Sequence, residues 1–220
     1  MIQNRSRIVL CDLEGTLVNS IPAVRRAIVQ TAREFGADGT DQEIYSKVID
    51  YNARAVYAGD LDRFFQRIFE LLSEPRREIA IGLTDVYPDT FYFLAKLQVH
   101  KAKLGVISDT PEERAQVLVN QLELRPFLVT VQSISESNPR PDKPHPEIAL
   151  RALRAMSNSN GDQIYVVGDS AMDIKCGQNL AQALSRKVTT ILVNRLGTAQ
   201  VDPDYEAKDL HDAANYILAN

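Results

Sequence analysis

The sequence feature that most constrains the fold is an apolar run that ends at a polar side chain, and it occurs four times. The runs cover residues 8–11, 104–107, 127–131 and 163–167. Segments with helical periodicity separate them, and this alternation predicts the strands and helices of a parallel βαβ sheet. The carboxyl ends of such strands lie at one edge of the sheet, where open α/β folds bind their ligands. We therefore expect the polar residues after the four strands to lie close together.

The polar residues that follow the four strands differ in chemistry from one strand to the next. In chain order they are Asp12, Glu14, Gly15 and Thr16; Ser108 and Asp109; Lys143, at the end of a polar loop; and Asp169 and Asp173. A single strand that ends in an acidic residue is common and carries little information. Four such ends that supply carboxylates, a hydroxyl and a lysine are hard to explain by packing alone.

The segment between the first two of these strands has a different pattern from the rest of the chain. Its apolar residues recur at helical spacing over residues 20–37, 41–57 and 60–72, without a strand-like run among them. The sequence therefore predicts an α/β fold, a doubly wound parallel sheet with a small all-helical insertion after the first strand. The expected domains are a core of residues 1–17 and 86–220 and an inserted domain of residues 18–85.

The rest of the chain returns to alternating helices and strands. Helices are expected over residues 91–97, 111–123, 146–156, 170–184 and 210–218, with one further strand over residues 188–193. These elements alternate with the strands named above, as the crossovers of a parallel sheet require.

Composition and charge limit the classes of function. The chain has 220 residues and a formal net charge of −4 without a basic block, which argues against a nucleic-acid-binding protein. Cys11 and Cys176 form neither a CxxC motif nor a disulfide framework, so a reducing compartment fits. Residues 1–7 are too polar, and the apolar run after them is too short, for a signal peptide or a membrane span. We expect a cytoplasmic monomer or dimer that binds neither nucleic acid nor membrane.

At the four strand ends the chain resembles the haloacid dehalogenase-like superfamily, whose members are mostly magnesium-dependent phosphatases. The family motifs follow one another in the same order: a nucleophile loop at residues 12–16, then Ser108, then Lys143, then Gly168-Asp169-Ser170 with Asp173. The resemblance covers nearly the whole chain and is nearest to the phosphoglycolate phosphatase-like branch. It implies a Rossmann-like core with a small helical cap inserted after the first motif.

The first three strand ends supply the groups that phosphate chemistry needs. Asp12 can attack phosphorus, as the aspartate does in ATPases that form an aspartyl-phosphate. Gly15 permits a tight turn that brings backbone N–H groups towards an anion, and Thr16 adds a hydroxyl. Ser108 and Lys143 are expected to complete the cradle, with Lys143 as the fixed cation for the transferred oxygens.

A metal ion is expected at the same place, because a carboxylate that approaches a phosphate dianion needs its charge neutralised. Mg²⁺ prefers carboxylate, water and substrate oxygens, and Asp12 and Asp169 are the expected direct ligands. Asp173, one helical turn after Asp169, is expected to hold a metal-bound water. The resemblance adds the backbone carbonyl of Glu14 as a ligand. The expected reaction is hydrolysis of a small phosphorylated metabolite through an aspartyl-phosphate.

Two residues depart from the family pattern. Glu14 stands where most family phosphatases have Asp, the residue that protonates the leaving oxygen and then activates water. The extra methylene moves the carboxylate, and a misplacement of about 1 Å can cost about 10²-fold in rate. The branch that resembles enolase-phosphatases carries Asp-x-Glu-Gly-Thr, so Glu14 is compatible with turnover. Asp109, where relatives often have Asn or Ser, adds negative charge near the phosphate.

Three interpretations of the sequence stay open. The first is the phosphatase, the second is a catalytically degenerate relative that binds a phosphometabolite or a protein partner, and the third is a phosphomutase. Dehalogenase chemistry is the least favoured, because it needs no metal and this site is rich in carboxylates. Arg25, Arg54 and Arg63 of the insertion could contact a substrate anion, although charges on exposed helices usually only face solvent.

Overall fold

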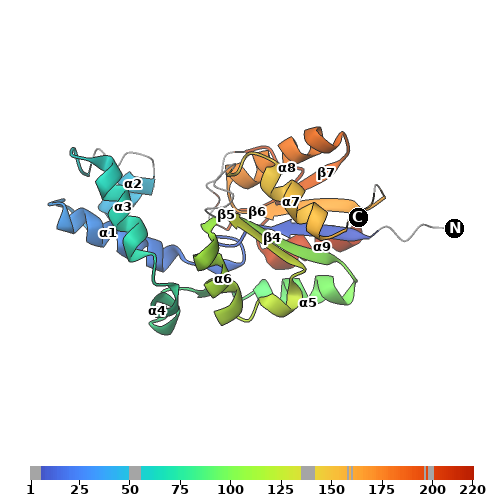
Figure 1. The fold of residues 1–220 in the computed structure, drawn as a ribbon, viewed down its shortest axis with the longest axis horizontal. Helices are drawn as coiled ribbons and strands as arrows, with labels where there is room; N and C mark the ends of the chain where they lie inside the picture. The colour runs from blue at the N-terminus through green and yellow to red at the C-terminus, as the bar shows by residue number, and fades with distance from the viewer. Residues whose placement is uncertain are drawn as a thin grey trace. The chain divides into compact units, whose positions relative to one another are not determined.

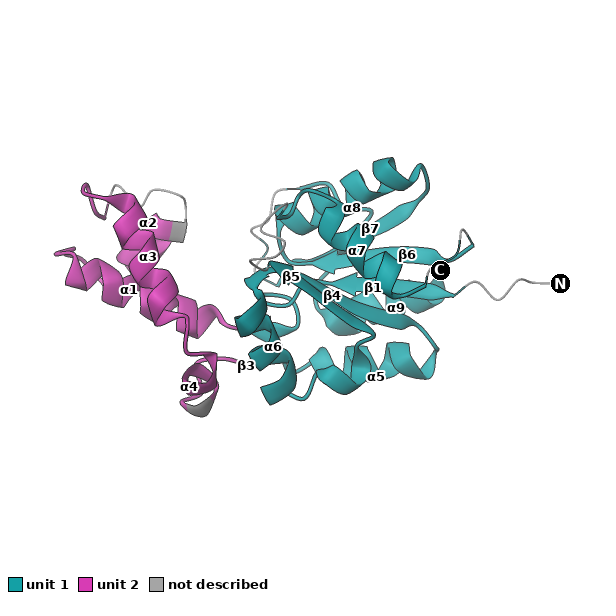
Figure 2. Ribbon diagram, in the orientation of Figure 1, with its two compact units in different colours: residues 1–19, 86–220 teal, residues 20–85 magenta. Residues whose placement is uncertain are grey.

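The chain divides into two compact units (Figure 2). The computed structural model describes residues 6–49, 56–134, 142–157, 159, 161–195, 197 and 201–220. The larger unit, residues 1–19 and 86–220, contains a six-stranded sheet. The smaller unit, residues 20–85, is called the helical insert below. It follows the first strand, so the predicted helical insertion at this point of the chain is confirmed.

The six-stranded sheet is parallel. Its strands are β1 (Arg7–Cys11), β4 (Lys103–Pro111), β5 (Thr130–Ile134), β6 (Gln163–Gly168), β7 (Val188–Val193) and β8 (Tyr205–Ala207), in the spatial order β5-β4-β1-β6-β7-β8. Leu10 of the central strand β1 pairs with Gly105 of β4 on one side and Val166 of β6 on the other. The strand order therefore changes direction beside β1, and such a switch point is where open α/β sheets bind ligands.

Helices cover both faces of this sheet. They are α5 (Thr90–Val99), α6 (Glu112–Gln121), α7 (Glu147–Ala155), α8 (Ala171–Leu184) and α9 (Leu210–Ala219). α7 and α8 pack together over Ile8 and Leu10 of β1, and α5 lies on the opposite side of the sheet (Figure 1). There α5 packs against α9. The predicted doubly wound α/β fold is confirmed.

The first strand is apolar from Ile8 to its end because both of its faces are covered. Residues Ile8 to Cys11 are all buried, and strands that are buried on both faces give continuous apolar runs instead of an alternating pattern. The backbone N–H of Asp12 donates to the carbonyl of Val167 at 2.9 Å, which ties the end of β1 to β6. The polar residue after the strand is thus fixed by the rigid centre of the sheet.

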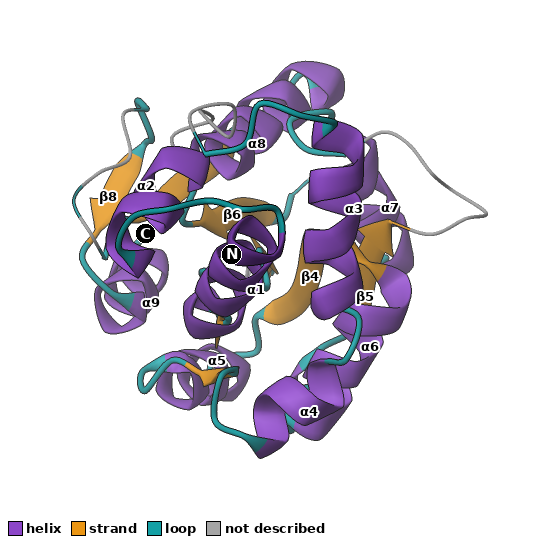
Figure 3. Ribbon diagram, turned by 90° about the vertical axis from the view of Figure 1, so that its left-hand side faces the viewer, coloured by secondary structure: helices purple, strands orange, loops and turns teal. Residues whose placement is uncertain are grey.

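The helical insert consists mainly of helices, drawn purple in Figure 3. It has an apolar core of its own. Its helices are α1 (Ile21–Glu34), α2 (Asp41–Ile49), α3 (Leu61–Leu71) and α4 (Pro75–Ala80), and the short strands β2 (Val18–Asn19) and β3 (Asp85–Val86) pair at its two ends. The ring of the fully buried Phe64 lies 5.7 Å from the rings of Phe35 and Tyr57, centroid to centroid. Asp60 caps α3, because its carboxylate accepts hydrogen bonds from two N–H groups of the first turn.

One predicted strand is wrong in its position. The sequence predicts a strand over residues 127–131, but Arg125–Phe127 forms a 3₁₀ turn and β5 starts only at Thr130. Pro126 favours the turn, because its fixed φ suits the start of a helix and it lacks a backbone donor. Val129 is 55% exposed, so part of the apolar run lies outside the sheet.

Other elements differ from the prediction in smaller ways. The predicted helix over residues 41–57 is described as α2 up to Ile49, and residues 50–55 lie outside the described residues. The sequence predicts neither α4 nor β8, because both are short and β8 is defined by its pairing with β7. Within the part of the chain that the structure describes, no helix has both the length and the apolar character needed to cross a membrane.

Candidate active site

The loop after β1 folds tightly against the end of β6. Asp12 begins this loop and is 6% exposed. Gly15 has a φ of 99°, which favours glycine, and a Cβ at this position would lie 2.7 Å from Cγ of Asp169. The hydroxyl of Thr16 donates to Oδ1 of Asp169 at 3.1 Å. Gly15 is therefore needed for the close approach of the two strand ends.

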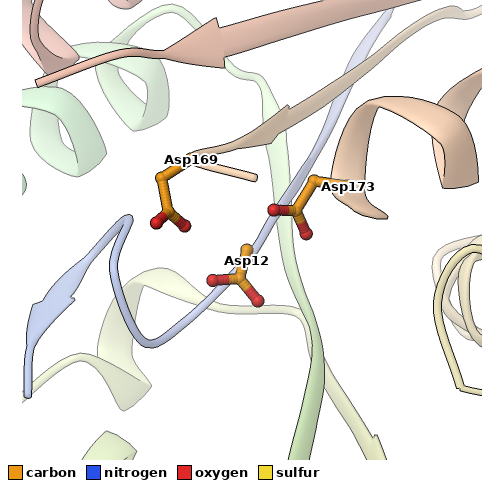
Figure 4. A group of neighbouring side chains, drawn as sticks. All are labelled: Asp12, Asp169 and Asp173. Atoms are coloured by element: carbon orange, nitrogen blue, oxygen red, sulfur yellow. The ribbon is translucent and has the colours of Figure 1, made fainter. Parts of the chain in front are cut away.

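Three carboxylates from separate elements meet at this edge of the sheet. Asp12 follows β1, Asp169 follows β6, and Asp173 lies in the first turn of α8. Each offers one oxygen, and these oxygens lie within 4.8 Å of one another. Figure 4 shows the three side chains converging from their separate elements. The sequence expectation that these strand ends lie close together agrees with this arrangement.

The start of α8 fixes the position of Asp173. The hydroxyl of Ser170 accepts from the N–H of Asp173 at 3.4 Å, and Oδ2 of Asp173 accepts from the N–H of Ser170 at 3.0 Å. This reciprocal pair is a capping box, which satisfies two backbone donors at the helix start. A Cβ at Gly168 would collide with the Asp173 side chain, so glycine at the end of β6 makes room for it. The second oxygen of Asp173 faces Lys143.

Lys143 lies between two of these carboxylates. Its Nζ is 2.5 Å from Oδ1 of Asp12 and 2.6 Å from Oδ1 of Asp173, and the residue is 6% exposed. Its backbone N–H donates to Oδ1 of Asp109 at 2.9 Å. Asp109 thus anchors the backbone that carries the lysine, a contact that the sequence does not predict.

Burial sets the ionisation of these groups. It raises the pKa of Asp12 well above the usual range; Lys143 opposes this shift, whereas Asp173 and Asp169 add to it. Burial, together with Asp173, raises the pKa of Asp169 to about 6. Burial lowers the pKa of the Lys143 ammonium, but Asp12 and Asp173 outweigh this effect and the pKa is raised. The cluster therefore concentrates acidic groups around a single lysine.

The acidic cluster has the chemistry of a site for a divalent cation. Its donors are all carboxylate oxygens, which Mg²⁺ and other hard cations prefer. Neighbouring carboxylates disfavour one another's charged forms, and a cation would relieve that repulsion. Asp12 and Asp173 are 6% and 1% exposed, so bulk water screens them weakly. The residues present therefore fit a divalent metal ion.

Glu14 is not a member of this cluster, because its carboxylate contacts donors on β4 and α6. Nη2 of Arg114 donates to Oε1 at 2.8 Å, and Nε of Arg114 donates to Oε2 at 3.1 Å. The hydroxyl of Thr110 donates to Oε2 at 2.6 Å. Thr110 in turn accepts from the hydroxyl of Ser108 at 3.0 Å. Ser108, Thr110 and Glu14 thus form a continuous chain of hydrogen bonds.

Arg114, like Thr110, is a residue of this site that the sequence analysis does not find. It lies in the first turn of α6 and is 8% exposed. Its carboxylate partner stands a hundred positions earlier in the chain, so no local spacing connects them. The available signal is topological: a strand end brings the first turn of the following helix to the same edge of the sheet.

Two of the insert arginines that could contact a substrate anion, Arg25 and Arg63, lie over aromatic rings. The guanidinium of Arg25 lies 5.8 Å from the ring centroid of Tyr45, and that of Arg63 lies 5.7 Å from the ring centroid of Phe35. Arg54 lies outside the described residues. The contacts of Arg25 and Arg63 are cation–π interactions within the insert and assign no ligand to these side chains.

Known proteins resemble the chain over most of its length. The sequence model of the family described as haloacid dehalogenase-like hydrolase matches residues 7–180, a range that contains every candidate site residue. A phosphoglycolate phosphatase of Aquifex aeolicus is 27% identical over 173 residues, which cover 78% of this chain and 80% of that protein. An N-acetylmuramic acid 6-phosphate phosphatase of Pseudomonas putida is 26% identical over 184 residues, which cover 80% of this chain and 79% of the relative.

Solved structures share the fold. A haloacid dehalogenase-like family hydrolase of Streptococcus pneumoniae superposes with a TM-score of 0.73, at 18% sequence identity. The superposition covers 96% of this chain and 98% of that one. At this level of identity, the similarity concerns the path of the backbone through both the sheet and the inserted helices.

Proposed function

The chain belongs to the haloacid dehalogenase-like hydrolase family, and from this premise we propose that it is a Mg²⁺-dependent phosphatase of small phosphorylated metabolites. The observation that carries the proposal is the contact of Asp12 with Lys143 inside the acidic cluster. It brings a nucleophile, a fixed cation and candidate metal ligands together at one edge of the sheet. The names of the relatives, a phosphoglycolate phosphatase and an N-acetylmuramic acid 6-phosphate phosphatase, support a small phosphorylated substrate.

In the proposed reaction, a carboxylate oxygen of Asp12 attacks phosphorus while the bond between phosphorus and the leaving oxygen breaks. Lys143 reduces the repulsion between this carboxylate and the incoming phosphate, because its ammonium already lies 2.5 Å from Oδ1. Asp12, Asp169, Asp173 and the backbone carbonyl of Glu14 would hold Mg²⁺, which when bound supplies positive charge to the phosphate oxygens.

The acyl-phosphate on Asp12 is then hydrolysed by water, which restores the carboxylate and releases inorganic phosphate. We assign the proton transfers of both steps to Glu14: it gives a proton to the leaving oxygen and then takes one from the attacking water. Gly15, Thr16 and Ser108 form the proposed cradle of the phosphate. Asp109 acts indirectly in this scheme, because it anchors the backbone of Lys143.

An aryl phosphate assay tests this function. The purified protein should hydrolyse para-nitrophenyl phosphate with Mg²⁺, lose the activity in excess chelator and regain it when Mg²⁺ is restored. Hydrolysis that persists in the chelator would remove the metal from the proposal. Complete inactivity towards aryl and alkyl phosphates in Mg²⁺ would overturn the function itself, and saturable binding of a phosphate ester without turnover would favour a catalytically degenerate relative.

A phosphomutase shares the core and needs a separate criterion. A hydrolase releases inorganic phosphate, whereas a mutase returns the phosphoryl group to a second hydroxyl of a sugar phosphate. Free phosphate formed in proportion to the substrate consumed is therefore the expected result. Isomerised sugar phosphate without phosphate release would replace the hydrolase by the mutase.

A further inference from the structure

We propose that Arg114, assisted by Thr110, is the positioning residue that fixes the carboxylate of Glu14 for the hydrolysis of the phospho-enzyme. The inference rests on the proposed function, because it concerns the second step of that reaction. It assigns a role to a buried arginine that the sequence motifs do not include. Glu14 itself touches the reacting atoms in this scheme, and Arg114 acts only through Glu14.

The contacts come from three separate elements. Glu14 lies in the loop after β1, Thr110 lies near the end of the neighbouring strand β4, and Arg114 lies in the first turn of α6. Nη2 and Nε of Arg114 bind the two carboxylate oxygens, at 2.8 Å and 3.1 Å, and the hydroxyl of Thr110 binds one of them at 2.6 Å. Three donors on two elements define both the position and the plane of the carboxylate.

Burial makes this pairing a strong constraint. The Arg114 side chain is 8% exposed and that of Glu14 is 19% exposed. A buried guanidinium without its carboxylate would carry an uncompensated charge, which is strongly destabilising. Neither side chain can therefore swing away cheaply, in contrast to an exposed ion pair whose partners are solvated.

The length of Glu14 matches this arrangement. Aspartate at the same position would withdraw the carboxylate by one methylene, about 1.5 Å of bond length. Hydrogen bonds of 2.6 to 3.1 Å would then exceed the range in which such bonds form unless the loop moved. The departure from the family's aspartate and the buried arginine of α6 are thus explained together, as two halves of one contact.

The test separates the two chemical steps with an aryl phosphate. An aryl leaving group departs without much help from an acid, so kcat/KM reports attack by Asp12, whereas kcat reports hydrolysis of the phospho-enzyme. Arg114→Met should lower kcat by about 10²-fold with little change in kcat/KM. Rapid-quench experiments should show a burst of the aryl alcohol and accumulated phospho-enzyme. Arg114→Lys should recover only part of kcat, because an ammonium lacks the planar fork.

Two comparisons decide whether Arg114 acts through Glu14. The double variant Glu14→Gln/Arg114→Met should be no slower than Glu14→Gln alone, because the second change removes a support that no longer matters. Arg154→Met is the matched control, since Arg154 forms an exposed ion pair with Glu147 on α7. It should leave kcat and kcat/KM unchanged. Thr110→Val removes a single hydroxyl and should lower kcat in the same selective way. It serves as the test if Arg114→Met does not fold.

The outcomes also separate this inference from the proposed function. An inactive wild type would overturn the function and, with it, the role of Arg114. An active wild type with unchanged Arg114→Met and Thr110→Val variants would overturn the inference alone. So would a parallel loss of kcat and kcat/KM, which indicates a general disturbance of the site, or losses that add in the double variant.

Discussion

The larger unit and the helical insert each contain a cation between two carboxylates, and the two networks differ in their contact with water. At the sheet edge, Lys143 binds Asp12 and Asp173, and these side chains are between 2% and 8% exposed. In the insert, Arg67 binds Glu34 and Glu70, and its network is between 35% and 52% exposed. The connectivity is the same and the environment is opposite.

Both cations lower the pKa of their acidic partners, and the environment decides the direction of the net shift. Hydrogen bonds from Arg67 and Gln30 lower the pKa of the exposed Glu34. Burial raises the pKa of Asp12 even though Lys143 opposes the shift. An exposed pair needs nothing further, whereas the buried cluster needs additional positive charge to be fully ionised. The comparison teaches that burial, and not pairing, distinguishes the candidate reaction centre from a solvated helix surface.

The change with the largest expected effect removes the nucleophile from the buried network. Asp12→Asn should lower phosphatase activity by at least about 10³-fold, because amide nitrogen and oxygen cannot form the acyl-phosphate. Lys143 keeps its contact with Asp173, so the fold should survive. Initial rates with an aryl phosphate and circular dichroism check both points. Retention of a tenth of the wild-type rate would contradict the role of Asp12.

The next change shortens the side chain of Glu14, whose carboxylate binds Arg114 and Thr110 and is not part of the Lys143 network. Glu14→Asp should lower kcat by about 10²-fold, because the carboxylate loses its reach to Arg114 and Thr110. The substitution restores the residue that most family members carry, so a higher rate is the natural competing expectation. Steady-state kinetics decide between them, and an increase in kcat would mean that the loop is not built around glutamate.

The third prediction concerns Mg²⁺, which would supply positive charge to the buried carboxylates. At 100 times its Kd, Mg²⁺ should stabilise the folded protein by about 2.7 kcal/mol and raise Tm by about 5 °C or more. Asp169→Asn should remove most of this rise, because Asp169 is one of the three oxygen donors. Differential scanning fluorimetry with and without Mg²⁺ measures both. An equal shift in wild type and variant would place the ion elsewhere on the molecule.

The ion pair of Arg195 with Asp89 in the larger unit has intermediate exposure. Its removal should therefore have an intermediate effect on the free energy of unfolding. Arg195 binds both oxygens of Asp89 at 2.9 Å, and the N–H of Leu210 donates to Asp89 at 2.8 Å. Asp89→Asn should lower the free energy of unfolding by about 2 kcal/mol at pH 7. Urea unfolding curves of wild type and variant give this difference.

The same pair predicts a pH dependence. Burial raises the pKa of Asp89, but the hydrogen bonds from Arg195 and Leu210 outweigh it and the pKa is lowered. A carboxylate with a lowered pKa stabilises the fold above its unfolded pKa of about 3.9 and loses this contribution as the pH falls through the folded value. The stability difference between wild type and Asp89→Asn should therefore be constant from pH 7 to pH 5 and shrink below pH 4. A difference that grows on acidification would refute the assignment.

The smallest effect is expected in the exposed network of the insert. Glu34→Gln removes a partner of Arg67 in water, where such pairs contribute less than about 1 kcal/mol. The urea midpoint should move less than in Asp89→Asn, and raised salt should reduce the difference further. A loss as large as that of Asp89→Asn would show that exposure does not rank these networks.

The sequence predicts most of the sheet because buried parallel strands appear in it as continuous apolar runs. The run from Ile8 to Cys11 is apolar throughout, the run Val188–Val193 is apolar except for two β-branched threonines, and both coincide with strands. The segment before Thr130 is apolar as well, yet Pro126 turns it before β5 begins. β8 has no apolar run, and it becomes a strand only through its pairing with β7.

The site residues, like the strands, divide into those that local sequence patterns reveal and those that depend on long-range contacts. Asp12, Asp169 and Asp173 follow strand ends that local patterns reveal, and the structure brings these three together. The contacts of Arg114 with Glu14 and of Asp109 with the backbone of Lys143 join distant segments. No spacing rule encodes such pairs, because they depend on how the loops and helix starts are placed once the sheet has formed.

The position of β1 in the sheet has a consequence for biosynthesis. Its residues pair with residues 103–106 of β4 and residues 163–167 of β6, so both neighbours are translated long after it. At about 5–20 residues per second, the strand waits on the order of ten seconds with both hydrogen-bonding edges unpaired. The buried residues of the insert core, which lie between Ala27 and Ile68, are all translated well before that. The nascent chain therefore carries, ahead of both its pairing partners, an apolar strand whose unpaired edges could pair with another chain.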